Sequence, residues 1–263
     1  MQIIECVPNF SEGRNQSVIE KIADSIRAVP EVKLLDYSAD SDHNRSVFTF
    51  IGTPKGIVKA AYDSAEMALD LIDVNKHEGV HPRLGAVDVI PFIPLKGIRM
   101  KDCIKLATQL GYELETHLHL PVYFYGEATT EKAYKNLANL RRDAHNLKTH
   151  RTGGAVCIGA REVMVAFNIN LKSNDIEDAK KMIRLIREND RLTSCIKLLP
   201  LFLPSKNCVQ VSTWITNPKK LPVEKVKVEM TKISQTLHIP ILEFEQIGLT
   251  PEQVNKAVKE FRI

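Results

Sequence analysis

Residues 196–216 read IKLLPLFLPSKNCVQVSTWIT. Two runs rich in aliphatic, aromatic and β-branched residues flank the polar turn Ser205-Lys206-Asn207, and this pattern predicts a β-hairpin. The flanking segments predict strands at 162–171 and 240–248 and helices at 175–188 and 223–237. The second half of the chain therefore follows the order β-α-β-β-α-β, which is the split βαβ arrangement of ferredoxin-like domains.

The first half opens in the same order and adds one helix–strand unit. Its strands are expected at 3–10, 32–40, 46–53, 87–95 and 121–128, and its helices at 16–28, 55–72 and 100–117. Residues 127–154 are polar and basic with a Gly-Gly end, so we expect a connection between domains that contains a helix around 133–141. A last helix should begin at Thr250-Pro251-Glu252.

These elements predict an α/β (α+β) fold with two consecutive α/β-sandwich subdomains, residues 1–126 and 155–263. Both subdomains would contain ferredoxin-like βαββαβ elements. We expect a ligand groove between them, because small-molecule sites often occur at domain interfaces.

Composition excludes several classes of protein. With 263 residues, 44% of them hydrophobic and 26% charged, the chain is typical of a soluble globular protein. The net charge of +4 comes without a Lys/Arg block, so we expect no nucleic-acid partner, and the mild excess suits either a small anionic substrate or an ordinary solvated surface. No apolar run approaches the ~18 residues of a membrane span. Five scattered cysteines without C-x-x-C spacing indicate a reducing, cytoplasmic location.

Residues 77–81 read HEGVH, formally the pattern of a zinc peptidase. That motif needs a helix that places both histidines on one face, one turn apart. Gly79 costs about 1 kcal/mol relative to alanine in a helix, and Pro82 disfavours the α conformation at His81. We therefore expect a loop that delivers His81 to a cleft, a helix-end or hydrogen-bonding role for His77, and no metal.

Polar clusters fall where predicted strands end: PNFSEGRN at 8–15, DHNR at 42–45, HEGVHPRLGAVD at 77–88, YGEA at 125–128 and AFNINL at 166–171. Some of these residues have a purely structural alternative. Asn15 could cap the first helix, Asn44 and Arg45 could serve the hairpin, and Asp88 could hydrogen-bond a neighbouring loop. The cluster after the first strand, however, holds more polar groups than a turn requires.

The segments at 5–15, 42–52, 71–94, 121–128 and 159–171 closely resemble the glutamate formimidoyltransferase family. The similar segments keep the family's order from residue 3 to about residue 171, and a weaker likeness continues to the end. The resemblance implies transfer of a formimino group from N-formimino-L-glutamate to tetrahydrofolate in histidine degradation. It further implies a stand-alone, homodimeric form without the cyclodeaminase domain, with its catalytic residues in the N-terminal subdomain. A formyl-transferring relative and a folate-binding paralogue without transfer activity are the alternatives.

The resemblance places the family's catalytic histidine at His81. A histidine suits this reaction because it can accept the proton that the attacking folate nitrogen loses and return one to the departing amine. Arg83 and Arg45 are expected to pair with substrate carboxylates, since guanidinium and carboxylate groups match in a bidentate way. Asp40, or alternatively Asp42, is expected to orient His81.

The remaining predicted contacts concern tetrahydrofolate, the acceptor substrate. They are Asn9, Glu12, Tyr125, Gly126, Glu127, Thr152, Gly153, Gly154 and Asn168. The segment AHNLKTHRTGG at 144–154 is shorter and less aromatic than the matching folate segment of the family, which implies weaker folate binding or a grip by other residues. Basic side chains of the connection could hold the folate tail: Lys132, Lys135, Arg141, Arg142, Lys148 and Arg151.

Overall fold

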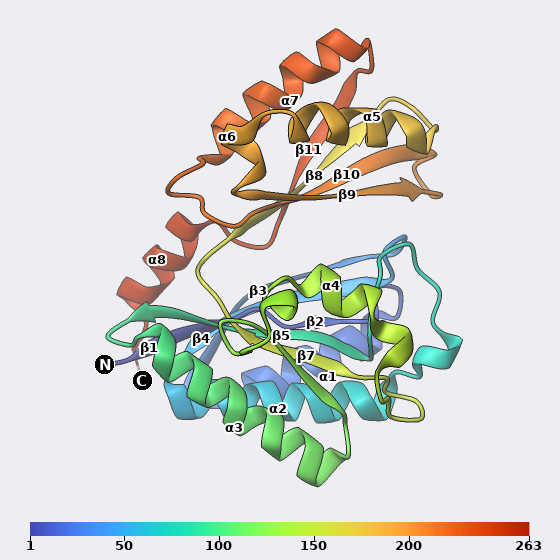
Figure 1. Ribbon diagram of the computed structural model, residues 1–263. Helices are drawn as coiled ribbons and strands as arrows, with labels where there is room; N and C mark the ends of the chain where they lie inside the picture. Colours follow the sequence, from blue (N-terminus) through green and yellow to red (C-terminus); the bar gives the residue numbers. More distant parts are fainter. Residues whose placement is uncertain (263) are drawn as a thin grey trace. The chain divides into compact units, whose positions relative to one another are not determined.

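The computed structural model describes residues 1–262 and divides the chain into two compact units (Figure 1). The first contains Met1–Arg161 and is joined by the C-terminal segment from Glu252 onward. The second contains Glu162–Pro251. Both units are α/β, so the predicted fold class is confirmed.

The sheet of the first unit has a ferredoxin-like half and a parallel extension. Its strands are β1 (Ile3–Cys6), β2 (Asn9–Phe10), β3 (Val32–Asp40), β4 (Arg45–Gly52), β5 (Val87–Lys96), β6 (Val122–Gly126) and β7 (Val156–Ala160). β1 and β2 form one interrupted strand that pairs antiparallel with β4 on one side and β5 on the other. β3 pairs with β4 at one end, while β7 and then β6 extend the sheet in parallel beyond β5.

Three long helices of the first unit cover one face of its sheet (Figure 1). They are α1 (Gln16–Arg27), α2 (Pro54–Leu71) and α3 (Met100–Leu118). Asn15 caps α1 by accepting hydrogen bonds from Ser17 and Val18, and Thr53 caps α2 ahead of Pro54, as their residue types favour. Apolar side chains of these helices pack against the strand residues of a single core that includes Phe10, Phe48, Phe50 and Phe92. The opposite face of the sheet is left to polar groups and a smaller apolar cluster.

The structure differs from the expected domain boundaries at 126 and 155. Strand β7, which the sequence did not predict, lies between β5 and β6 in the first sheet. Residues 127–154 connect the parallel strands β6 and β7, and such a connection must cross over and be long. This crossover holds three short helices, η2 (Lys132–Lys135), α4 (Leu137–Arg142) and η3 (Ala144–Asn146), where a single helix was expected. It is part of the first unit, in the segment Met1–Arg161.

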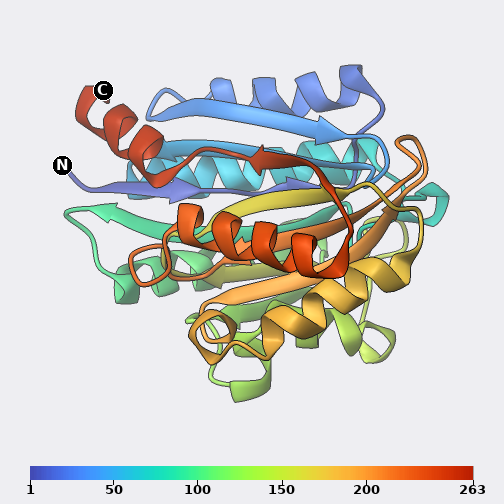
Figure 2. The same ribbon diagram turned by 90° about the horizontal axis from the view of Figure 1, so that it is seen from above.

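The second unit has the βαββαβ order that the sequence predicts. Its elements are β8 (Val165–Leu171), α5 (Ile176–Arg187), α6 (Asp190–Thr193), β9 (Ile196–Leu203), β10 (Cys208–Ile215), α7 (Val223–Leu237) and β11 (Ile241–Ile247). The sheet is antiparallel in the order β11-β8-β10-β9, and the predicted hairpin joins β9 to β10. Helices α5 and α7 lie side by side over this sheet (Figure 2) and share its apolar core.

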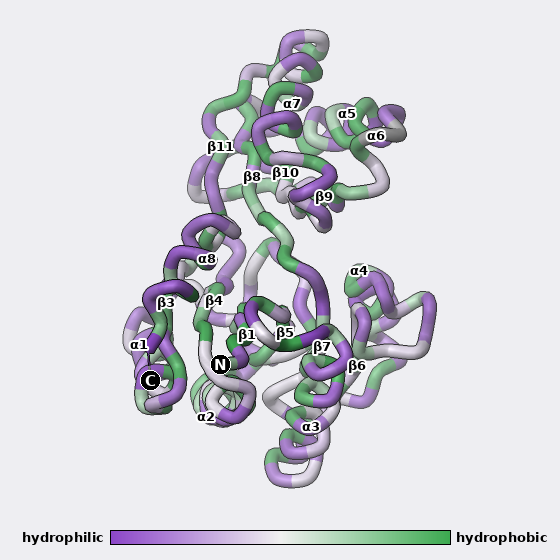
Figure 3. The backbone as a smooth tube through the Cα atoms, turned by 90° about the vertical axis from the view of Figure 1, so that its left-hand side faces the viewer, coloured by the Kyte–Doolittle hydropathy of each residue, from purple (hydrophilic) through white to green (hydrophobic). Residues whose placement is uncertain are grey.

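Hydrophobic residues concentrate in the central strands of both sheets, such as β5, β7 and β8 (Figure 3). The last helix, α8 (Pro251–Glu260), begins where the sequence predicts, and it buries Val254 and Val258. No helix within residues 1–262 is long and apolar enough to cross a membrane.

Candidate active site

The turn between β3 and β4 is fastened to the loop that follows η1 (Val74–Lys76). Asn44 adopts a left-handed conformation with φ of 45°, which asparagine tolerates better than most residues. Its side chain accepts a hydrogen bond from the Gly13 backbone (2.9 Å) and donates one to the Glu78 carbonyl (2.9 Å). The Val80 backbone N–H donates to the Asp42 carbonyl at 2.9 Å. These bonds join the β3–β4 turn and the loop after η1, which are far apart in sequence, into one wall of the site around His81.

Arg83 braces this wall from within. Its guanidinium donates to the carbonyl oxygens of His43 (3.0 Å) and His81 (2.7 Å), and it also contacts the His77 ring. His77 Nε2 lies 2.8 Å from the Asn44 carbonyl, and because a carbonyl only accepts, Nε2 carries the proton. Burial, followed by the charge of Arg45, lowers the pKa of Arg83 to about 10. The sequence predicts that Arg83 binds a substrate carboxylate. In the structure its guanidinium already donates to backbone carbonyl oxygens.

The segment containing His77 and His81 is a loop, as Gly79 and Pro82 predict. The helix η1 ends at Lys76, and His77 already has extended backbone angles. The hydrogen-bonding role expected for His77 is what the structure shows. Among the side chains that the structure describes, which leave out those of residues 190, 191 and 263, no group of three His, Cys, Asp or Glu is arranged to hold a metal ion.

His81 is buried, with 5% of its surface exposed. Its Nδ1 lies 2.7 Å from the Pro82 carbonyl oxygen, so Nδ1 is the protonated nitrogen and Nε2 carries the lone pair of the neutral ring. Burial lowers the pKa of His81 well below its usual value, and the charges of Arg45 and Arg141 lower it further, while Asp88 opposes them in part. The ring is therefore a neutral base whose proton-accepting atom is Nε2.

Asp88 is the fully buried carboxylate at the centre of the polar cluster. Asn9 pairs with Val89 and Phe10 with Val87, so Asp88 is the extra residue of a β-bulge. Bulges next to active sites change the direction in which a side chain points. Its Oδ1 accepts a hydrogen bond from the Leu84 backbone at 2.8 Å, as the structural alternative for this residue anticipated. This bond ties the bulge to the end of the loop that carries His81.

Two arginines converge on the other oxygen of Asp88. Arg45 Nη1 on β4 and Arg141 Nη2 on α4 lie 2.7 Å and 2.5 Å from Oδ2. Burial alone would raise the pKa of Asp88, but the charges of Arg141 and Arg45 outweigh it and hold that pKa well below its usual range. Asp88 is therefore ionised at every physiological pH.

Asn9 is the predicted folate contact that lies next to this cluster. Its Oδ1 accepts a hydrogen bond from Arg45 Nε at 3.2 Å, and its Nδ2 donates to the Val7 carbonyl at 3.0 Å. Glu12, predicted for the same role, instead accepts from the backbones of Arg14 and Asn15, at 2.8 Å each, and shapes the turn before α1.

Asp40, the residue predicted to orient His81, contacts the backbone of the β3–β4 turn. Its Oδ1 accepts a hydrogen bond from the His43 backbone at 2.7 Å and so closes the β3–β4 turn. The carboxylate that favours protonation of His81 is Asp88. Asp88 on β5 is therefore an acidic neighbour of His81, and its hydrogen bond to Leu84 ties it to the end of the loop.

Tyr125, Gly126 and Glu127 lie at the end of β6. Tyr125 packs with Val89 and Cys157 in a small apolar cluster, and burial raises the pKa of its phenol to about 12. Gly126 has φ of 65°, where a side chain would be strained. Glu127 pairs with Lys135 at 3.0 Å on the surface. Only Tyr125 of the three is buried with the residues around Val89.

Residues 152–154 form a turn that docks beside the end of the His81 loop. His150 Nδ1 accepts hydrogen bonds from the backbones of Thr152 (3.3 Å) and Gly153 (3.0 Å). The Gly153 carbonyl accepts from Ala86 at 2.9 Å, and Gly154, with φ of 67°, bridges to Gly85. This turn positions the backbone between His81 and Asp88.

Asn168 lies in the second unit. It projects from β8 and donates to Glu245 Oε2 on β11 at 3.1 Å. Beside it, Gln210 donates to Asn170, which in turn donates to Glu243 (2.8 and 2.6 Å). Asn168 is thus one member of a polar ladder across the second sheet.

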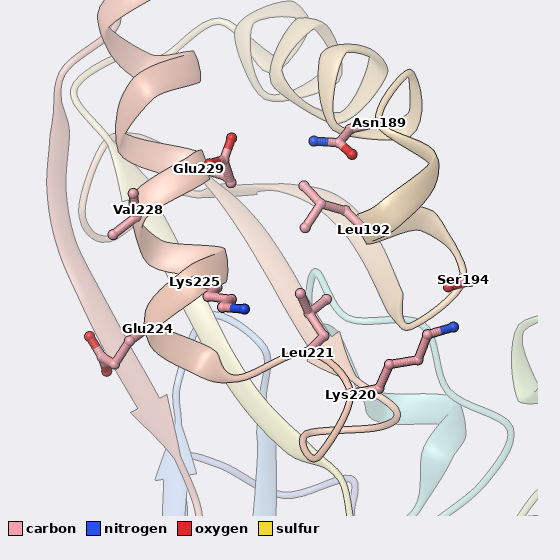
Figure 4. Close-up of a pocket in the computed structure, with 9 residues that line it drawn as sticks. All are labelled: Asn189, Leu192, Ser194, Lys220, Leu221, Glu224, Lys225, Val228 and Glu229. Atoms are coloured by element: carbon pink, nitrogen blue, oxygen red, sulfur yellow. The ribbon is translucent and has the colours of Figure 1, made fainter.

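An open groove of ≈ 780 Å³ also lies in the second unit, near α6 and the start of α7 (Figure 4). Its lining residues are Asn189, Leu192, Ser194, Lys220, Leu221, Glu224, Lys225, Val228 and Glu229. Its lining includes none of the residues predicted for the site, and its acidic and basic side chains come from α7 and from the turn before it.

Sequence reasoning missed three members of the cluster around His81. The sequence assigns Arg141 to holding the folate tail and Asp88 to hydrogen bonding alone, and it gives His43 no role. The ring of His43 lies beside that of His81. The signal available for Asp88 was a lone charge inside the apolar run VDVIPFIP, since a fully buried carboxylate requires a partner.

Comparisons with known proteins show the family of the chain. Residues 3–163 match the model of the formiminotransferase domain, N-terminal subdomain, and residues 166–263 match the formiminotransferase domain. Glutamate formimidoyltransferase of Thermoplasma acidophilum is 38% identical over 96% of this chain and 89% of its own. The enzyme of the same name from Streptococcus pyogenes serotype M1 is 34% identical over 99% and 93%.

The chain also matches a longer protein over part of its length. Formimidoyltransferase-cyclodeaminase of Rattus norvegicus is 36% identical over 95% of this chain, which spans 50% of the rat protein. The two domain models together run from residue 3 to residue 263, and the stand-alone relatives match along nearly their whole length. The chain belongs to the formiminotransferase family.

Proposed function

We propose that the chain transfers the formimino group of N-formimino-L-glutamate to tetrahydrofolate, with His81 moving the protons. The observation that carries the role of His81 is its hydrogen bond to the Pro82 carbonyl, which leaves Nε2 as the basic nitrogen of a buried, neutral ring. The family and the names of the stand-alone relatives support the choice of reaction.

The reaction needs one group that first accepts and then donates a proton. The folate nitrogen attacks the electrophilic formimino carbon, a C–N bond forms, and the proton of that nitrogen moves to His81 Nε2. The bond between the formimino carbon and the glutamate nitrogen then breaks, and the same proton passes to the leaving nitrogen. Atoms and charges balance with a single histidine, because each proton that His81 accepts is returned.

The surroundings of His81 suit both halves of this cycle. Burial and the neighbouring arginines lower its pKa, so the ring is neutral when it must accept a proton. The same low pKa makes the resulting imidazolium a stronger acid than an ordinary histidine, which favours return of the proton to the amine. The hydrogen bond from Nδ1 keeps the ring in one orientation throughout.

An assay of purified protein with N-formimino-L-glutamate and tetrahydrofolate tests the proposal. Formation of formimino-tetrahydrofolate and free glutamate in equal amounts is the expected result. Turnover with N-formyl-L-glutamate but not with the formimino donor would instead identify a formyl transferase. Folate binding without turnover of either donor would identify the non-catalytic paralogue. Each of these two outcomes would overturn the proposed function.

A further inference from the structure

Arg45, Asp88 and Arg141 form a buried cluster with an excess of positive charge. Two guanidinium groups surround one carboxylate, and the side chains are 8%, 0% and 15% exposed. His81 beside them is neutral, so it leaves the net positive charge of the cluster unchanged. A buried charge without a counter-charge is costly to maintain. The cluster therefore has the electrostatics of a site that binds an anion.

Hydrogen-bond donors in the same cluster lack acceptors. Arg141 Nε and Arg45 Nη1 are buried and have no hydrogen-bond partner within the described residues. The contact of Arg45 Nη1 is its ion pair with Asp88 Oδ2 at 2.7 Å, an oxygen that it shares with Arg141. Buried donors in native proteins are nearly always satisfied, by protein, water or ligand. The unpaired Nε of Arg141, next to a second guanidinium group, points to a ligand that brings its own acceptor oxygens.

The electrostatic potential from the neighbouring charged groups is positive as well. Burial and Arg141 lower the pKa of Arg45, against the influence of Asp88. Arg83 is also close enough to both Arg45 and Arg141 for their charges to depress its pKa. Three arginines and one aspartate therefore act on one another beside His81. A carboxylate is the anion that a guanidinium fork recognises best among small metabolite groups other than phosphate.

We propose that the Arg45–Asp88–Arg141 cluster is the binding site for the α-carboxylate of the formimino donor. This inference rests on the proposed function. The α-carboxylate is separated from the leaving nitrogen by a single carbon, whereas three carbons separate the side-chain carboxylate from it. A site next to His81 therefore fits the α-carboxylate, because the leaving nitrogen must lie within reach of Nε2.

In this arrangement the division of work among the arginines differs from the sequence-based expectation. Arg83 holds the loop through backbone carbonyls. Arg141, which lies against Asp88, binds the substrate carboxylate in place of Arg83. Asp88 keeps both guanidinium groups in position without neutralising them fully. Arg141 comes from the crossover between β6 and β7, so this segment contributes to donor binding rather than only to folate binding.

The test pairs a change in the protein with a change in the ligand. Arg141→Gln is compared with wild type for N-formimino-L-glutamate and for its α-carboxamide analogue. Wild type should prefer the α-carboxylate donor by about 10- to 100-fold in kcat/KM, the range of a charge-assisted hydrogen bond. Arg141→Gln should lose most of that preference, while the KM for tetrahydrofolate stays unchanged. Arg184→Gln, an exposed arginine on α5, is the matched control and should behave as wild type.

Several outcomes would overturn the assignment. An equal effect of Arg141→Gln on both donors would show that the cluster does not sense the α-carboxylate. Loss of discrimination against the side-chain carboxamide analogue instead would place the other carboxylate there. Thermal unfolding checks that the variants fold, and Arg141→Lys, which keeps the charge but not the fork, replaces Arg141→Gln if needed.

Calorimetric titration of the donor without folate separates this inference from the proposed function. Arg141-dependent binding of the donor by a protein that never transfers the group would support the site and refute the reaction. Turnover with a donor KM that is indifferent to Arg141→Gln would support the reaction and refute the site.

Discussion

The rings of His43 and His81 lie 5.6 Å apart, centroid to centroid, with their planes inclined by 37°. Both residues are buried, and the backbone of His43 is held by Asp40 at its N–H and by Arg83 at its carbonyl. A positive charge on His43 would oppose protonation of His81, which adds to the effect of the arginines. The base is therefore surrounded mainly by groups that keep it neutral.

Replacement of His81 by asparagine should abolish most of the activity and spare binding. General acid–base groups contribute about 10²- to 10⁴-fold, so kcat should fall by a factor in this range. Stopped-flow or absorbance assays of formimino transfer measure it, with calorimetric binding of both substrates as a check on the fold. His117→Ala, which changes an exposed histidine on α3, is the control. Near-normal kcat in His81→Asn would remove this residue from the mechanism.

The pH dependence should differ between the free protein and the complex. Burial, Arg45 and Arg141 lower the pKa of His81, so the acidic limb of kcat/KM should lie below about pH 6.5, the ordinary value for histidine. A bound carboxylate offsets the arginine charges, so the limb of kcat should move to higher pH. Rate profiles from about pH 5 to pH 9 measure both limbs. Coincident limbs would argue against a donor carboxylate beside His81.

Glu5 on β1 should make the stability of the chain depend on pH. Burial raises the pKa of Glu5 to about 7, and Arg161 opposes the shift only in part. A raised pKa in the folded state means that the contribution to stability is complete below about pH 4.5 and is lost as the pH rises through about 7. The loss corresponds to about 3 kcal/mol at most.

Glu5→Gln tests this linkage. The variant should lose less stability than wild type between about pH 5 and pH 8, as measured by urea unfolding at each pH. Glu260→Gln changes an exposed glutamate of α8 and should leave the wild-type profile intact. Parallel profiles for wild type and Glu5→Gln would show that Glu5 does not titrate in this range.

Substitutions of Asn44 should separate backbone strain from hydrogen bonding. Asn44→Gly keeps the left-handed conformation but loses the bonds to Gly13 and Glu78, whereas Asn44→Ala loses both bonds and is also strained. Alanine should therefore be less stable than glycine by about 1 kcal/mol, and both should lower kcat because the wall around His81 loosens. Equal stabilities would mean that the conformation of the turn changes in the variants.

The fold of the second unit could be predicted because its signals are local. The hairpin at 196–216 has two strand-like runs and a polar turn, and its neighbours show clear periodicity. Strand β7 gave no such signal, since VCIGA is five residues long, is buried throughout and contains a glycine. Without β7, the crossover from 127 to 154 resembled a linker between domains.

The candidate site could be predicted only where its geometry depends on residues that are close together in the sequence. Gly79 and Pro82 predict the loop at His81 directly. The contacts of Asp88, in contrast, come from β4 and from α4, which lie 43 and 53 residues away along the chain. The contacts of Arg83 were unpredictable for a related reason, because its partners are backbone carbonyls, which leave no trace in the residue types.

The anchoring of α4 also determines where this chain can be lengthened. Leu140 and Arg141 are fixed to the sheet, and Lys148 is bonded through its backbone to the hydroxyl of Tyr123. Residues 145–146 between these anchors are exposed, and a doubling of loop length costs only about 0.6 kcal/mol. A peptide tag or a reporter domain inserted there would leave both anchors in place, whereas the same insertion before α4 would change the path by which Arg141 reaches Asp88.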